Sequence, residues 1–161
     1  MNAKLKEQIL RNLTPLDTEE LYANMLDECY GEVKIAGMSF QTSRALKELD
    51  PTAFRCGMVD YIDSLSLVEI DGDYFEFEAC DAERDELISE LESEISDLET
   101  EISDLESEIE DLSEEESQTA EDAKEILTQI DSRRESIEGI NMKIAAINKE
   151  IAEINKSLCL L

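Results

Sequence analysis

Carboxylates dominate the side chains that could do chemistry in this sequence. Its 161 residues include 42 Asp and Glu against 14 Lys and Arg, with no histidine. Paired carboxylates can act as acid and base, but Asp60 and Asp63 have the i, i+3 spacing that is ordinary on a helix surface. The Asp-Gly-Asp at 71–73 does not fit a calcium loop, because Leu67 stands where that loop needs an acid. Phosphate-binding loops and nucleophile elbows are also absent, so we expect no enzyme and no cofactor.

Cysteine is the other reactive residue type in the chain. The four cysteines, Cys29, Cys56, Cys80 and Cys159, are scattered and form no Cys-x-x-Cys pair. Zinc sites need closely spaced Cys or His ligands, which this sequence lacks. It therefore predicts reduced, structural cysteines and no bound metal.

The net charge of −28 limits the partners of the chain. Nucleic acid and anionic membranes would repel it, whereas basic protein surfaces would attract it. No apolar run is long enough to span a bilayer, and the N-terminal MNAKLKEQILRNL lacks the apolar core of a secretory signal. We expect a cytosolic protein that binds a basic protein surface, with no direct contact to nucleic acid or membrane.

Composition changes near residue 80, which indicates two regions. Both prolines, all the aromatic residues and four of the five glycines precede that point. We predict a small α+β interaction domain over 1–79 and a coiled-coil region over 80–161. Charge divides the second region again, because residues 81–116 carry a net charge of −17 and residues 117–161 one of −2.

The first region predicts a helix, a strand, two helices and a β-hairpin, in that order. Asp50 suits the N-cap position and Pro51 the first position of a helix, and Asp71-Gly72 is a strong signal for a tight hairpin turn. The predicted elements are a helix from Thr18 to about Cys29, a strand within 32–40 with a turn at Gly37, a helix over 43–49, a helix from Pro51 to about Leu65, and a β-hairpin over 66–78.

This order is winged-helix-like, and many winged-helix domains bind DNA. The helix that would read DNA offers one cation, Arg55, against Asp50, Asp60 and Asp63, and the predicted wing is acidic as well. A DNA-binding domain needs a basic face to neutralise phosphates. We therefore expect an interaction module.

The second region carries apolar residues at alternating spacings of three and four, which predicts a coiled coil. The first run of this seam is Ile88, Leu91, Ile95, Leu98, Ile102, Leu105, Ile109 and Leu112. The second run is Ala123, Ile126, Ile130, Arg133, Ile137, Ile140, Ile144, Ile147, Ile151, Ile154 and Leu158.

The residues that flank the first seam decide how it pairs. They are all acidic and form the candidate partner-binding face: Glu92, Glu94, Glu99, Glu101, Glu106 and Glu108. In a parallel homodimer these residues would face one another, and like charges disfavour that pairing. An antiparallel hairpin avoids the conflict, with a helix over 81–115, a turn near 116–120 and a helix over 120–159. Arg133 would then face Ile102, its stem along the seam and its head at the glutamates.

One long parallel coiled coil is the alternative. The heptad phase continues unbroken across the predicted turn, and no Gly or Pro enforces a reversal there. Isoleucine at both core positions of the second run would suit a trimer. This arrangement predicts a homo-oligomer.

Residues 20–65 contain a distinctive set of residues: Leu46, Asp50, Pro51, Phe54, Arg55, Gly57, Asp60, Tyr61, Asp63 and Ser64. In this set the segment resembles a family of small, mostly uncharacterised proteins of tailed bacteriophages and prophages. The resemblance covers less than a third of the chain. It implies a phage source but brings no established activity. Together with the cytosolic location expected above, a phage source predicts a protein of the host cytoplasm.

These observations favour a non-enzymatic phage protein that acts by protein–protein binding. DNA carries about one negative charge per 1.7 Å of axis, and the acidic helix comes within a factor of two of that density. The sequence thus suggests an anti-defence inhibitor that mimics DNA and occupies a basic site of a host or phage protein. The alternative function is a structural or assembly coiled-coil protein that oligomerises.

Overall fold

The computed structural model describes residues 1–114 and 119–157 and divides the chain into two compact units. The small unit is Ala3–Glu83; the other, the hairpin unit, begins at Arg84 and also includes Met1–Asn2. The division falls within a long helix, whereas the predicted boundary lies at residues 79–80. Within the described residues, no helix combines the length and the apolar character that a membrane span requires.

The small unit contains four helices and two separate β-hairpins. In chain order its elements are α1 (Ala3–Asn12), α2 (Thr18–Tyr30), β1 (Glu32–Ile35), β2 (Met38–Gln41), α3 (Thr42–Leu49), α4 (Pro51–Asp63), β3 (Leu67–Ile70), β4 (Asp73–Glu76) and the first residues of α5 (Phe77–Glu114). The predicted small α+β region is therefore present, with a helix, α1, that the sequence analysis did not predict.

Local turn chemistry explains several of these boundaries. The Asp50 carboxylate accepts a hydrogen bond from the Ala53 amide, and Pro51 opens α4. Asp71 and Gly72, both with positive φ (55° and 93°), join β3 to β4. This is the two-residue turn whose twist matches that of paired strands, and both predictions are confirmed.

The segment 32–41 differs from the prediction of one strand. It forms a hairpin of its own, because Ala36 and Gly37 both adopt positive φ and return the chain. In the described residues, β1 and β2 form a two-stranded sheet, and β3 and β4 form a second, separate one. The β3–β4 pair instead gains a bridge from Leu16, whose amide donates to the Tyr74 carbonyl at 2.8 Å.

An aromatic cluster joins α2 to α4. The Tyr22 ring lies 5.1 Å from that of Phe54 and 5.8 Å from that of Tyr61. Gly57 makes this packing possible, since a Cβ there would lie 2.1 Å from the Tyr22 hydroxyl oxygen. The Asp27 carboxylate accepts bonds from the amide and hydroxyl of Ser43, and so ties α2 to α3.

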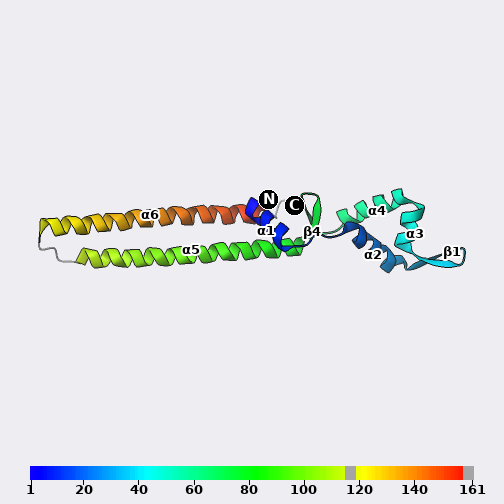
Figure 1. Ribbon diagram of the computed structural model, residues 1–161, viewed down its shortest axis with the longest axis horizontal. Helices are drawn as coiled ribbons and strands as arrows, with labels where there is room; N and C mark the ends of the chain where they lie inside the picture. Colours follow the sequence, from blue (N-terminus) through cyan, green and yellow to red (C-terminus); the bar gives the residue numbers. More distant parts are fainter. Residues whose placement is uncertain (115–118, 158–161) are drawn as a thin grey trace. The chain divides into compact units, whose positions relative to one another are not determined.

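The hairpin unit consists of most of α5 and of α6 (Ala120–Ser157), which run side by side in opposite directions (Figure 1). Each helix has 38 residues, or about 57 Å at 1.5 Å per residue. The antiparallel hairpin is thus present, and the single long parallel helix is wrong. Of the predicted turn, residues 116–118 lie outside the described residues. Helix α5 starts at Phe77, not at 81, because β4 leads directly into it.

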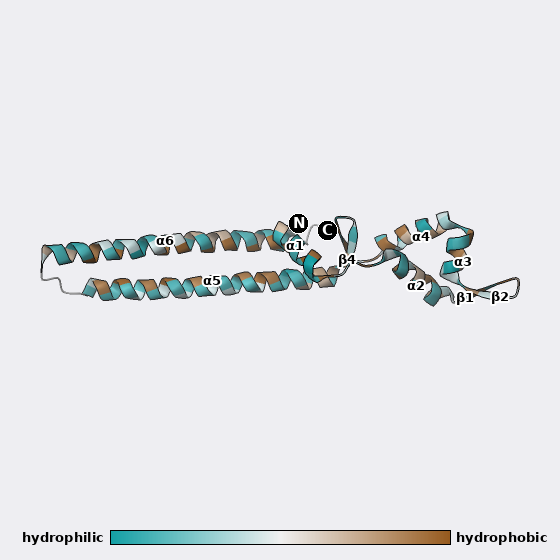
Figure 2. Ribbon diagram, viewed as in Figure 1, coloured by the Kyte–Doolittle hydropathy of each residue, from teal (hydrophilic) through white to brown (hydrophobic). Residues whose placement is uncertain are grey.

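Burial along α5 and α6 follows the predicted seam. Between Ile88 and Leu112 every seam residue is buried or half-buried, and every other residue is exposed. All the predicted seam residues of α6 up to Ile154 are likewise covered; Leu158 lies outside the described residues. Figure 2 shows the apolar residues recurring along both hydrophilic helices.

Candidate protein-binding surfaces

The acidic face of α5 is the first candidate surface. All six predicted residues are exposed, because they flank the seam without entering it: Glu92, Glu94, Glu99, Glu101, Glu106 and Glu108. Between Glu90 and Glu114 the helix carries twelve carboxylates and no basic residue. We call these twelve carboxylates the acidic face.

Four further carboxylates, which were not among the predicted residues, join Glu94, Glu101 and Glu108 in a row along one side of this face. The members of this row are spaced alternately by four and three residues and are all exposed: Glu90, Glu94, Asp97, Glu101, Asp104, Glu108 and Asp111. Residues at such spacing lie above one another on a helix, where like charges repel. The side between this row and the other glutamates carries hydroxyl residues such as Ser96, Thr100 and Ser103. The spacing alone could have revealed the row.

Among the described residues, Arg133 is the one cation that pairs with the acidic face. The Arg133 Nε donates to a Glu108 carboxylate oxygen at 2.6 Å, which confirms that the Arg133 head lies at the glutamates. The contact follows from helix geometry, because side chains lean toward the N-terminus of their helix. In an antiparallel pair, Arg133 therefore leans toward the turn and Glu108 leans away from it.

The other carboxylates of the acidic face are exposed to solvent and lack a cationic partner among the described residues. No ion pair joins them to any described residue other than Arg133. Cations of α6 pair within α6 instead, as in Arg134 with Asp131 and Lys149 with Glu153. These pairs are exposed and of the kind that contributes little to stability.

An apolar groove lies on the small unit, beside the β1–β2 hairpin and α3. Paired residues of an antiparallel hairpin share one face, so Val33, Phe40, Ile35 and Met38 form an apolar face. Ile35 and Met38 are 42% and 60% exposed. They line a hollow of about 170 Å³ together with Leu49, which is 74% exposed. Exposed apolar side chains gathered in this way are typical of contact surfaces.

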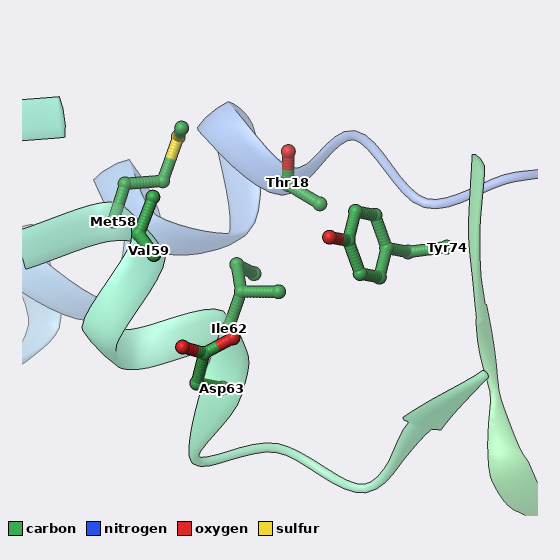
Figure 3. A pocket seen from close by; sticks show the side chains of 6 residues that line it. All are labelled: Thr18, Met58, Val59, Ile62, Asp63 and Tyr74. Carbon is green, nitrogen blue, oxygen red and sulfur yellow. The ribbon is translucent and has the colours of Figure 1, made fainter. Parts of the chain in front are cut away.

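A second, smaller hollow lies between α4, the start of α2 and β4. Its volume is about 70 Å³. Figure 3 shows the Tyr74 ring reaching toward α4, with its hydroxyl facing the space between Thr18 and Ile62. The lining residues are Thr18, Met58, Val59, Ile62, Asp63 and Tyr74. Sequence reasoning missed this site because its sides come from distant parts of the chain.

The three cysteines within the described residues lie apart from one another and are free thiols. Cys80 is fully buried. Burial raises the pKa of its thiol, and the negative charge of nearby Glu83 raises it further. A raised pKa keeps the thiol protonated and unreactive. Cys29 and Cys56 are exposed on separate helices. Among the described residues, no group of three or more Cys, Asp or Glu side chains could hold a metal ion.

Comparisons of the chain with protein-family models, with curated proteins and with solved structures found no match. The likeness of residues 20–65 to tailed-phage proteins therefore stays a prediction, and the surfaces described above carry the functional argument.

Proposed function

We propose that this is a non-enzymatic, phage-encoded binding protein whose helical hairpin presents its acidic face to a basic site on a host or phage protein. The observation that carries the proposal is that the two sides of α5 differ in burial and in charge. Its apolar seam is covered by α6, while twelve carboxylates face solvent with one cation, Arg133, beside them.

The spacing of these charges supports mimicry of a nucleic acid backbone. Twelve carboxylates over residues 90–114 amount to about one charge per 3 Å of helix axis. One strand of DNA carries a phosphate about every 3.4 Å. A basic groove that tracks a phosphate backbone would therefore meet a similar linear charge density on α5.

A phage source supports a more specific role as an inhibitor of host defence. Enzymes that cut or bind nucleic acid have basic channels lined by Lys and Arg. A polyanion that occupies such a channel excludes the nucleic acid by competition. This role requires a partner on the host side, in the host cytoplasm.

The small unit acts as a winged-helix-like interaction module in this proposal. The order of α2, α3, α4 and the β3–β4 hairpin and the bridge from Leu16 to Tyr74 support the comparison, while the separate β1–β2 sheet departs from it. The charge of α4 supports binding to protein, since Arg55 is its one cation.

The test is a pulldown from host lysate at low and high salt, with a DNA oligonucleotide as competitor. We expect a partner that is retained at low salt, released at high salt and displaced by the oligonucleotide, because the contact is electrostatic and screened by ions. A variant that removes four charges from the acidic face should lose the partner. It carries Glu94→Gln, Asp97→Asn, Glu101→Gln and Asp104→Asn.

A matched control removes four exposed charges from the small unit, so that net charge changes equally. It carries Glu28→Gln, Asp60→Asn, Glu69→Gln and Asp73→Asn. This control should retain the partner. The proposal is wrong if no partner is retained at either salt concentration, or if both variants lose it alike.

A further inference from the structure

The small hollow between α4 and Tyr74 combines apolar walls with unused oxygen groups. Ile62 forms a buried wall, and Met58 packs into the aromatic cluster behind it. The Tyr74 hydroxyl and the Asp63 carboxylate have no hydrogen-bond or ion-pair partner among the described residues. An apolar stem with a cationic head would therefore find complementary groups here.

We infer that this hollow binds an arginine side chain of the protein partner. A guanidinium can pair with the Asp63 carboxylate, donate a further hydrogen bond to the Tyr74 hydroxyl oxygen, or stack on the Tyr74 ring. Its methylene stem would lie against Val59 and Ile62. Lysine fits less well, because an ammonium group cannot stack as a plane or form two parallel bonds to a carboxylate.

The size of the hollow agrees with the head group of one side chain. A water needs roughly 10–15 Å³ of such space, so about 70 Å³ accommodates a few waters or one head group. Figure 3 shows the open space between the Tyr74 ring and the α4 side chains. A whole helix or strand of a partner would not enter it.

The hollow is held in place before any partner binds. The bridge from the Leu16 amide to the Tyr74 carbonyl fixes the strand that carries the ring. Ile62 is 6% exposed and anchors α4 on the other side. A preformed pocket spares the partner the cost of ordering it.

The inference rests on the proposed function for the basic character of the partner. The charge of the small unit independently favours binding of a cationic side chain, because residues 3–83 include 18 acidic and 7 basic residues. Val59, 53% exposed at the rim, leaves the hollow open to solvent.

The test uses the full chain and N-acetyl-arginine amide, followed by NMR of the Met58 and Ile62 methyl groups and the Tyr74 ring. N-acetyl-lysine amide and N-acetyl-citrulline amide serve as the other probes, since citrulline keeps the size of arginine without its charge. We expect saturable shifts with arginine, weaker ones with lysine and none with citrulline. Asp63→Asn should weaken arginine binding about threefold, as the loss of one surface ion pair does.

Asp60→Asn is the matched control, because it removes the same charge from the same helix but lines a neighbouring hollow with Arg55. It should leave the arginine affinity unchanged. The inference is overturned if citrulline binds as well as arginine, if lysine binds as well as arginine, if Asp60→Asn and Asp63→Asn have equal effects, or if no probe shifts these signals. Partner retention by the hairpin is measured separately in the lysate. Failure of the arginine-binding inference can therefore be distinguished from failure of the proposed function.

Discussion

Replacing Gly57 by alanine should destabilise the small unit, although alanine is the better helix former. The new Cβ would lie 2.1 Å from the Tyr22 hydroxyl oxygen, closer than such atoms approach, and 3.0 Å from the Tyr22 Cζ, which is a tight contact. Tyr22 is 6% exposed and packs against Phe54 and Tyr61, so its ring has little room to yield. Gly57→Ala therefore forces the ring out of the cluster.

The magnitude follows from three opposing terms. Overpacking costs about 1–3 kcal/mol, and loss of an aromatic pair costs about 0.5–1.5 kcal/mol. Against these losses, alanine is more favourable than glycine within a helix by about 1 kcal/mol, which stabilises the Gly57→Ala variant. The net loss in unfolding free energy should be about 0.5–3.5 kcal/mol. For a unit of this size, each kcal/mol lowers Tm by about 4–8 °C.

Thermal unfolding followed by near-UV circular dichroism measures this loss selectively. The four tyrosines lie between residues 22 and 74 and there is no tryptophan, so the near-UV signal reports on the small unit. Gly139→Ala is the control, since a Cβ at Gly139 in α6 meets no atom within 4 Å. It should stabilise the hairpin unit by about 0.5–1 kcal/mol.

A second variant checks the cause. Tyr22→Phe in the Gly57→Ala background removes the clashing hydroxyl oxygen and should restore part of the lost Tm. The reasoning is refuted if Gly57→Ala leaves the near-UV transition unchanged or raises it, or if Tyr22→Phe deepens the loss.

Three shorter predictions concern other parts of the chain. Arg133→Leu should raise the far-UV Tm of the hairpin unit, because an apolar seam residue adds about 1–2 kcal/mol of burial against an ion pair worth less than about 1 kcal/mol; a lower Tm would contradict this. Ala36→Gly should stabilise the small unit by about 1 kcal/mol, since Ala36 holds φ of 51°, and near-UV melting checks it. Cys80, whose thiol pKa is raised by burial, should be alkylated far more slowly at pH 8 than exposed Cys29, as peptide mass spectrometry can show; equal rates would count against its burial.

The parts of the fold that local chemistry controls could be predicted from the sequence. The heptad seam from Ile88 to Leu112 is one case, because period and burial are linked directly in a coiled coil. The Asp50-Pro51 helix start and the Asp71-Gly72 turn are others, since each depends on residues adjacent in the chain. Charge flanking the seam correctly favoured the antiparallel arrangement over parallel pairing.

Features that depend on distant residues or on unusual backbone could not be predicted. Helix α1 is short, and Leu5 and Ile9 within it are buried by tertiary contacts that the local sequence does not predict. The β1–β2 turn places Ala36 in a left-handed conformation, where alanine is unexpected.

The candidate surfaces divide in the same way. Exposure of Glu94, Glu101 and their neighbours follows from the heptad. The hollow at Tyr74 requires Thr18 to lie beside α4 and β4, which are far from it in the sequence, and no local pattern predicts that contact.

The apolar seam lies on the inner side of α5 and the acidic face on its outer side. This separation has an evolutionary consequence. Folding of the hairpin constrains only every third or fourth position, so the outward positions can drift without unfolding the protein. Substitutions at these positions can then change the pattern of surface charge, residue by residue, while the architecture stays unchanged.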